Sequence, residues 1–484
     1  MTESIPGLGM SLPEVVVVLG AVGLVLARWL PPGARRPTTV AAGAVVAAST
    51  LVLVVVGVRW QLVPVLVGAA VMVPLAVPAL VRRRDGRPAW RARWWLALPG
   101  TVACLVLIAT GPAAAWALPV PVFPQPSGQF AVGTTVLQWT DPDRPETATP
   151  APDDRRTVVV QLWYPARPSA AGTERARYAG RTAHESHVVF GALADYLGVP
   201  GFLLDGTADA RTRSVPEAVV ADTDGRFPVV LFSPGLGGVR TQNTAWAEEL
   251  SSRGYIVVGV DHPYDSAAVV LADGTTARTL VAAAGDHAED QRRVNGWTAV
   301  RAADLSFVLT QVGRLDRGEI PGPFTDRLDT DRAAVTGHSV GGAAALLAAR
   351  QDARFAAVID IDGAPHDPDP QPFHQPVLVL SHPVDPAVNP TYLPLLNQVL
   401  NLDTAISYLL VVPGSAHLTF TDAPLFLPPV PSVVGTLGRT GALRMTIAAT
   451  VAFLDATLRG APGDLATRLK AHGELTVYRP GGPR

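Results

Sequence analysis

The sequence lacks the features of several protein classes. Cys104 is the only cysteine among 484 residues, so a disulfide-stabilised scaffold is excluded. This cysteine lies in an apolar run, where a buried and unreactive thiol is expected. Hydrophobic residues make up 48% of the chain, which excludes extended disorder.

Basic charge is scarce over most of the chain. Ten of the 39 basic residues precede Pro121, but only three of the 41 acidic residues do so. The larger part that follows is therefore acidic and would repel phosphate groups. We expect no nucleic-acid partner for this protein.

Four apolar segments of 19 to 25 residues dominate the first 120 residues: 12–30, 40–58, 62–81 and 94–118. Only the first contains charged residues, Glu14 and Arg28. A hydrocarbon core about 30 Å thick needs roughly 20 such residues per helix. Residues 1–120 are therefore predicted to form a membrane module of four transmembrane helices. The last three spans lack the ionisable residues that mark ion pathways, which favours an anchor over a transporter.

Arginines indicate the orientation of this module. The connection after the first span holds Arg35 and Arg36, and residues 82–93 between the third and fourth spans hold six arginines. The connection at 59–61 holds a single arginine. Positively charged connections stay in the cytoplasm. We therefore expect both termini, and all of the chain beyond the module, on the extracytoplasmic side of the plasma membrane.

The rest of the chain alternates between strands and helices. Residues 121–150 begin with a proline-rich stretch and are interpreted as a stiff linker and leading segment. Strands are expected at 157–164, 227–232, 255–260, 332–336, 355–361, 377–380 and 408–412. Helices are expected at 245–253, 297–312 and 342–350. This alternation predicts an α/β domain over 151–480, with a mostly parallel sheet covered by helices on both faces.

An apolar stretch at 190–204 has two interpretations. Its residues, FGALADYLGVPGFLL, lie ahead of the expected strand at 227–232. They could form a lipid-facing entrance, or an ordinary core helix with a connecting loop.

The segment 337–341, GHSVG, matches the G-x-S-x-G nucleophile elbow. It stands between an expected strand and an expected helix, as this elbow requires. The glycines leave room for a strained turn, and the helix that follows directs its N–H groups at a developing oxyanion. Ser339 is therefore predicted to be a nucleophile.

A serine nucleophile needs a base and an acid that orients the base. In this fold the acid and then the histidine follow the serine along the chain. His417 is favoured as the base because it follows the last expected strand in a short turn. Asp362 and Asp385 each follow an earlier strand, and Asp360 faces the same side as Asp362. The spacing alone leaves all three acids open.

The chain resembles the secreted platelet-activating factor acetylhydrolase family of α/β-hydrolases. The resemblance covers most of residues 155–425. It is carried by FSPGLGGVRT at 232–241, GYIVVGVDH at 254–262, DRAAVTGHSVGG at 331–342, RFAAVIDID at 354–362 and GSAH at 414–417. It implies an α/β-hydrolase fold and a triad of Ser339, Asp362 and His417, with Asp385 in reserve as the acid.

The acyl-transfer template adds an oxyanion hole made by the backbone N–H groups of Leu236 and Val340. One position departs from the animal enzymes of the family, since Pro234 stands where they carry a histidine before the oxyanion glycine. The four-span module is also foreign to those secreted proteins. The resemblance therefore supports the reaction class more strongly than the natural ester.

The expected function is that of a membrane-anchored serine esterase acting on short-acyl phospholipid or other lipid esters through an acyl-enzyme. Alternatives are a lipase-like or cutinase-like polyester hydrolase, another serine hydrolase with a non-lipid substrate, and a non-catalytic tethered binding protein. The chemistry needs no metal and no organic cofactor. The sequence leaves the acyl-chain length and the oligomeric state open.

Overall fold

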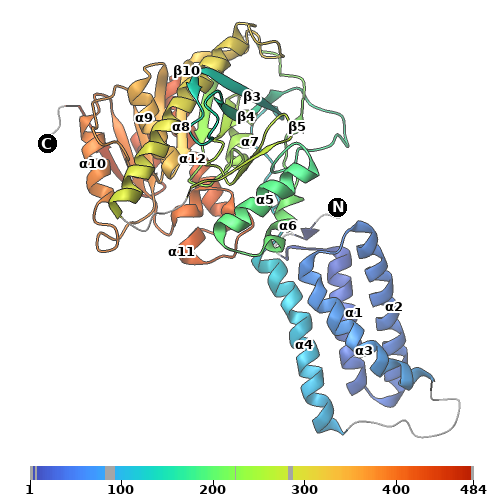
Figure 1. Ribbon diagram of the computed structural model, residues 1–484. Coiled ribbons are helices and arrows are strands. Elements are labelled where there is room, and N and C mark those ends of the chain that lie inside the picture. The colour runs from blue at the N-terminus through green and yellow to red at the C-terminus, as the bar shows by residue number, and fades with distance from the viewer. Residues whose placement is uncertain (1–3, 6–7, 82–92, 224, 282–286, 481–484) are drawn as a thin grey trace. The chain divides into compact units, whose positions relative to one another are not determined.

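The computed structural model describes residues 4–5, 8–81, 93–223, 225–281 and 287–480 (Figure 1). The chain divides into two compact units. The first comprises Met1–Val120 with Phe426–Pro428, and the second comprises Pro121–Leu425 with Pro429–Arg484. Each unit has its own hydrophobic core.

Four apolar helices dominate the first unit: α1 (Leu12–Leu26), α2 (Pro32–Val56), α3 (Val63–Val81) and α4 (Trp94–Ala117). Buried apolar side chains from these helices form its core, among them Val17, Val25, Leu53, Val65 and Ile108. The short strands β1 (Ser4–Ile5) and β2 (Met10–Ser11) pair ahead of α1.

The composition of this unit indicates membrane association. Three of its segments are long and apolar enough to cross a membrane over the described residues: Leu12–Trp29, Gly33–Val56 and Ala97–Ala117. The described side chains of α3 and of the turn before it, Trp60–Pro74, form a further apolar segment. A hydrocarbon core accepts such helices because all their backbone groups are hydrogen-bonded within the helix.

Helix α2 begins earlier than the apolar run predicts. It starts at Pro32, so Arg35 and Arg36 lie in its first turns instead of in a connection. Proline is favoured at the first helical position, because the N–H that it lacks would have no hydrogen-bond partner there. Arg35 Nη2 donates to the carbonyl oxygen of Leu30 (2.8 Å). Most of the predicted arginine-rich connection, residues 82–92, lies outside the described residues.

The acidic residue in the first span is paired. Glu14 is buried, and Arg59 Nε and Nη2 donate to its two carboxylate oxygens at 2.6 and 2.8 Å. The backbone N–H of Ser11 also donates to Glu14 Oε2 (2.6 Å). Burying an unpaired carboxylate is costly, so these partners explain how the helix bundle accommodates this charge.

A ten-stranded sheet forms the centre of the second unit, in the order β14-β13-β12-β11-β10-β6-β7-β4-β3-β5. The six strands from β13 to β7 run parallel, and β14, β4 and β3 add antiparallel edges. The strands are β3 (Ala131–Pro145), β4 (Arg155–Ala166), β5 (Val215–Pro216), β6 (Phe227–Ser233), β7 (Ile256–Asp261), β10 (Leu328–His338), β11 (Phe355–Ile361), β12 (Val377–Ser381), β13 (Ser407–Val411) and β14 (Glu474–Tyr478). A hairpin, β8 (Ala268–Val270) with β9 (Thr276–Arg278), stands apart.

Strand β3 lies within residues 121–150, which the sequence interpretation assigned to a linker and leading segment. It pairs with β4 along most of its length. Its outer half carries polar residues and two prolines, Pro142 and Pro145, so the apolar pattern of a central strand is missing there.

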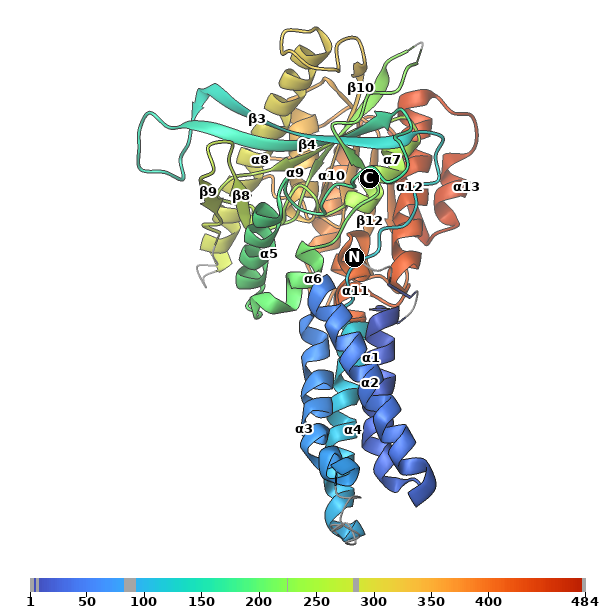
Figure 2. The same ribbon diagram turned by 90° about the vertical axis from the view of Figure 1, so that its right-hand side faces the viewer.

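Helices cover both faces of the sheet (Figure 2). Side chains of β6 alternate between the faces, as a strand requires. Val229 and Leu231 join the core that contains residues of α8 (His287–Asp316), α9 (Val340–Gln351) and α10 (Tyr392–Leu402). On the other face, Phe232 contacts Trp246 of α7 (Thr244–Ser252), with ring centroids 5.8 Å apart. The remaining helices are α5 (Ala183–Leu197), α6 (Asp205–Ala208), α11 (Pro431–Val434), α12 (Arg439–Arg459) and α13 (Leu465–Lys470).

Helix α12 lies with α7 on the second face. The segment Pro431–Arg459 also has the length and composition of a membrane span, but its residues pack against α7 and the sheet. Trp246 Nε1 donates to Thr450 Oγ1 of α12 (2.9 Å), and the ring of Phe453 packs against Tyr408 of β13. Length and overall composition alone therefore do not separate a helix that packs on a globular core from a membrane span.

Candidate active site

The predicted nucleophile occupies a strained turn between β10 and α9. Ser339 has φ 57° and ψ −125°, a region that residues other than glycine rarely adopt. Its backbone N–H donates to the carbonyl of Ile361 (2.9 Å), and its carbonyl accepts from Gly342 N (2.8 Å). The turn therefore holds Ser339 at the carboxyl edge of the parallel strands.

Two glycines of the motif are required by close backbone approach. A Cβ at Gly337 would lie 2.2 Å from the carbonyl carbon of Gly341, and a Cβ at Gly341 would lie 2.1 Å from the carbonyl oxygen of Ser233. Only glycine fits at such distances. The sequence reasoning that assigned these glycines to an elbow is matched by this geometry.

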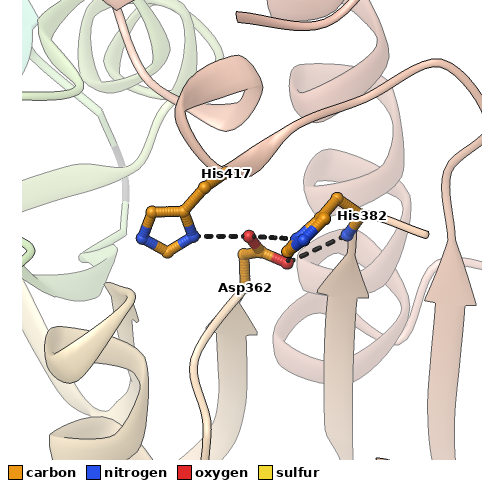
Figure 3. A group of neighbouring side chains, drawn as sticks. All are labelled: Asp362, His382 and His417. Atoms are coloured by element: carbon orange, nitrogen blue, oxygen red, sulfur yellow. Dashed lines mark hydrogen bonds and ion pairs between the residues drawn. The ribbon is translucent and has the colours of Figure 1, made fainter. Parts of the chain in front are cut away.

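The carboxylate of Asp362 contacts the predicted base. His417 Nδ1 lies 2.6 Å from Asp362 Oδ2 (Figure 3), and the other ring nitrogen points away from the carboxylate. Asp362 follows β11, is buried and has φ 57°. The ring of His417 also lies 4.6 Å from the ring of His338, the residue before Ser339. In the described part of the chain no hydrogen bond joins Ser339 to His417.

The two other candidate acids lie elsewhere. Asp385 is exposed and caps its own turn by accepting from the backbone N–H of Ala387 (2.8 Å). Asp360 is fully buried below the turn and accepts from Gly363 N (2.9 Å). Burial raises the pKa of Asp360 well above its usual range, because a low-dielectric surrounding disfavours the charged form. Neither contacts His417.

A second histidine binds the same carboxylate, and the sequence reasoning missed it. His382 Nδ1 lies 2.8 and 2.7 Å from Asp362 Oδ1 and Oδ2, and the backbone N–H of His382 donates to Oδ1 (2.9 Å). His382 follows β12, next to β11 in the sheet, and this position was the only available signal. Burial alone would raise the pKa of Asp362, but the hydrogen bonds from His382 and His417 outweigh it and hold that pKa below its usual range.

The spacing of these three groups also suits a metal ion. Asp362, His382 and His417 each offer a ligand atom within 4.8 Å of the others. However, both Nδ1 atoms already lie at hydrogen-bond distance from the carboxylate. A metal would have to displace those protons, so hydrogen bonding explains the arrangement of this cluster without an ion.

The residues Val340 and Leu236 lie next to the serine turn, the first in the chain and the second in space. Leu236 lies in the loop after β6, and a Cβ on the preceding Gly235 would come within 3.6 Å of Ser339 Cβ. Among the described residues the N–H of Leu236 has no acceptor. Val340 begins α9, and first-turn amides have no partner inside a helix. These are the two predicted oxyanion donors.

A buried arginine holds this loop, and no sequence motif predicted it. Arg301 of α8 is fully buried and donates to the carbonyl oxygens of Pro234 and Gly235, the latter at 3.1 Å. Asp265 balances its charge through Arg301 Nε (2.6 Å) and Nη2 (2.5 Å). The contact with Gly235 fixes the peptide group whose N–H belongs to Leu236.

His338 connects three parts of the site. Its Nε2 lies 2.9 Å from the carbonyl oxygen of His417, and its Nδ1 lies 2.8 Å from Gln242 Nε2. Gln242 Oε1 in turn accepts from Gly235 N (2.8 Å). Nε2 must donate to the carbonyl and Nδ1 must accept from the amide, which requires a neutral ring. Burial, with His417 nearby, lowers the pKa of His338 to about 3.

A second Ser–His–Asp chain lies inside the protein. Ser233 Oγ and His262 Nε2 are 2.9 Å apart, and His262 Nδ1 is 2.8 Å from Asp304 Oδ2. All three residues are fully buried, and Arg156 donates to both carboxylate oxygens of Asp304. Ser233 is part of β6 and out of reach of substrate. This chain is a structural network beneath the loop that contains Leu236.

Exposed apolar side chains border the same loop. The ring of Tyr196 at the end of α5 occupies the space beside Gly237, where a Cβ would lie 2.5 Å from it. Tyr196, Leu197, Val199 and Phe202 are 36 to 50% exposed. Phe190, Ala192 and Ala194 of α5 are buried, as the core-helix interpretation of residues 190–204 requires. Tyr196, Leu197, Val199 and Phe202 instead form an exposed apolar rim.

A strained serine elbow at the edge of a mostly parallel sheet, with a carboxylate-bound histidine nearby, defines the α/β-hydrolase class. The family model of platelet-activating factor acetylhydrolase, isoform II, matches residues 119–461. The chain belongs to this family of ester hydrolases.

Individual relatives are named as esterases. A probable 1-alkyl-2-acetylglycerophosphocholine esterase of Arthroderma benhamiae is 28% identical over 50% of this chain and 59% of its own length. Platelet-activating factor acetylhydrolase of Canis lupus familiaris is 28% identical over 36% of this chain and 44% of its own. The solved structure of ferulic acid esterase from Streptomyces cinnamoneus matches with a TM-score of 0.59 and 31% identity, over 73% of this chain and 98% of that one.

Proposed function

We propose that the protein is a membrane-anchored serine esterase that hydrolyses short-acyl phospholipid or related lipid esters through a Ser339–His417–Asp362 triad. The observation that carries this proposal is the hydrogen bond between His417 Nδ1 and Asp362, close to a serine in a strained elbow. A histidine held through Nδ1 leaves Nε2 to exchange a proton with the serine.

The reaction follows the acyl-transfer template. His417 Nε2 accepts the Ser339 hydroxyl proton as Oγ attacks the ester carbonyl carbon, and the carbonyl electron pair moves onto oxygen. The N–H groups of Leu236 and Val340 bind this oxyanion. When the intermediate collapses, the alcohol leaves with the proton from His417. Water then attacks the acyl-enzyme with His417 as base and releases the acid and free Ser339. The serine and histidine need to approach each other only in the substrate complex.

The exposed apolar rim favours a lipid substrate. Tyr196 lies beside Gly237 of the loop that carries Leu236, and Leu197, Val199 and Phe202 follow it closely in the chain and are also exposed. An exposed cluster of large apolar groups is typical of a binding surface for an apolar ligand. The apolar helices of the first unit would hold such an enzyme at its substrate, and the names of the curated relatives point to a phospholipid with an acetyl group.

One observation favours a second substrate class. The structural relative that acts on ferulic acid esters matches at 31% identity over nearly its whole chain. An aromatic or polyester substrate is therefore the alternative to a lipid ester. A purely binding role is the third candidate, and the retention of an intact elbow, base and acid argues against it.

Hydrolysis of nitrophenyl esters from acetyl to palmitoyl, and of a feruloyl ester, separates these candidates. We expect a rate that falls steeply as the acyl chain lengthens, because a short-acyl pocket excludes long chains. The Ser339→Ala variant supplies the background rate at each length. A rate that rises with chain length would indicate a lipase, and preference for the feruloyl ester would indicate the second class. A rate independent of Ser339 at every length would reject the esterase proposal.

The catalytic unit is proposed to lie on the extracytoplasmic side, and labelling of single cysteines tests this. The natural Cys104 is buried, so its background reaction is low. A cysteine at exposed Ser169 should react with a membrane-impermeant maleimide in intact cells. A cysteine at Gly86, in the predicted cytoplasmic connection outside the described residues, should react only after permeabilisation. The reverse pattern would place the catalytic unit in the cytoplasm.

A further inference from the structure

The Asp362 carboxylate accepts more hydrogen bonds than are needed to orient His417. Oδ2 lies 2.6 Å from His417 Nδ1 and 2.7 Å from His382 Nδ1. Oδ1 accepts from the backbone N–H of His382 (2.9 Å), and the Tyr392 hydroxyl lies 3.5 Å from it. Two titratable rings thus share one buried carboxylate (Figure 3).

We propose that His382 is a positioning residue of the esterase: it fixes the Asp362 carboxylate toward His417, and its protonation turns catalysis off at acidic pH. The inference rests on the proposed triad and concerns how that triad is regulated. His382 itself touches neither substrate nor the reacting atoms.

The positioning role follows from geometry. Two groups of His382 donate to the carboxylate. The backbone N–H contacts Oδ1, and the ring Nδ1–H lies at hydrogen-bond distance from both oxygens. This restricts rotation of the carboxylate about its Cβ–Cγ bond. Without the ring, Oδ1 would keep one backbone donor and the distant Tyr392 hydroxyl. A looser carboxylate would orient His417 less well. In metal sites, partners that orient a ligand histidine typically matter tenfold to a hundredfold, and we expect an effect of the same order here.

The acid-sensitive role follows from charge. In the transition state His417 becomes an imidazolium that Asp362 must stabilise. If His382 is already protonated, two cations share one carboxylate and the second is poorly compensated. The ring of Tyr392, which faces His382, does not offset this, because its hydroxyl is neutral. His417 itself is the third neighbour, with ring centroids 6.2 Å apart.

The sign of the effect follows from the titration of His382. Its hydrogen bond to Asp362 raises the pKa of His382 above the ordinary value, against the opposing effect of burial. His382 therefore takes up a proton at higher pH than a free histidine would. A proton on either ring of the pair impairs turnover, so the acidic limb of the rate profile belongs to the pair and not to one residue.

Two substitutions separate the roles. Asparagine places an amide N–H close to the position of a histidine Nδ1–H but cannot titrate, whereas leucine removes both the donor and the titration. For His382→Leu we expect kcat on the alkaline plateau to fall by roughly tenfold to a hundredfold with KM little changed. For His382→Asn we expect kcat to stay near wild type and the midpoint of the acidic limb to move down by at least about 0.3 pH units, the statistical effect of removing one of two shared sites.

The measurement is the pH profile of kcat and KM for a soluble short-acyl ester with the full chain in detergent. His374→Asn, at an exposed histidine before β12, is the matched control and should leave the profile unchanged. An unchanged profile in both His382 variants would overturn the inference, and so would equal losses of kcat in the two variants without a shift of the acidic limb. Loss of wild-type activity with EDTA and recovery with Zn²⁺ would also overturn it, in favour of a metal held by the same cluster. An inactive wild type would instead count against the proposed function.

Discussion

Replacing Ser339 by alanine should abolish esterase activity and covalent labelling by an organophosphate. Loss of the nucleophile of a triad lowers kcat by about 10⁶ in measured enzymes. Alanine carries the same Cβ as serine, so the strain at φ 57° and the fold should be unaffected. The measurements are kcat on a short-acyl ester and the mass of the labelled protein.

Ser233 is the matched control for that experiment. It also donates to or accepts from a histidine that is bound to an aspartate, but it is fully buried. Ser233→Ala should therefore still be labelled at Ser339, with a far smaller loss of activity. Labelling that persists in Ser339→Ala and disappears in Ser233→Ala would exchange the roles of the two serines.

Replacing Asp362 by asparagine should lower kcat by about 10⁴, with little effect on KM. In other serine hydrolases the corresponding change keeps the geometry but stabilises the wrong tautomer of the histidine and leaves the imidazolium uncompensated. Asparagine tolerates positive φ better than most residues, so the turn at φ 57° should survive. The measurement is kcat and KM on the same ester, with the circular dichroism spectrum as a check on folding.

Asp385→Asn is the control variant for the acid. The side chain is exposed and serves only its own turn, so activity should remain close to that of the wild type. If Asp385→Asn were the variant that lost activity, the acid would have to reach His417 in a different loop conformation, and the role of Asp362 would be rejected.

Several parts of the protein follow from local sequence. Strand β11 has the predicted bounds, β6 and β12 end one residue later than predicted, and β13 is shifted by one residue toward the N-terminus. Continuous apolar runs bounded by polar or glycine residues are typical of buried parallel strands. The elbow was predictable for a related reason. A G-x-S-x-G motif between a strand and a helix leaves few backbone conformations, and the glycines leave space that larger residues would fill.

Other parts needed the whole fold. Strands β3 and β14 and helix α12 escaped prediction because they mix polar and apolar residues, and this pattern becomes interpretable only beside the elements on which they pack. The same holds for Arg301, which reaches the loop at Gly235 from a helix 66 residues away in sequence. Such contacts depend on packing, and no local pattern encodes them.

The site divides in the same way. The sequence by itself determined the class of chemistry, since Ser339 and His417 stand at positions that an α/β-hydrolase reserves for nucleophile and base. The spacing left the acid open and the family resemblance pointed to Asp362, whereas the sharing of that carboxylate by His382 was decided by the tertiary structure alone. Asp360, Asp362 and Asp385 follow neighbouring strands and look alike in sequence. The order of β11 and β12 in the sheet brings Asp362 and His382 together, buries Asp360 below them and leaves Asp385 in solvent.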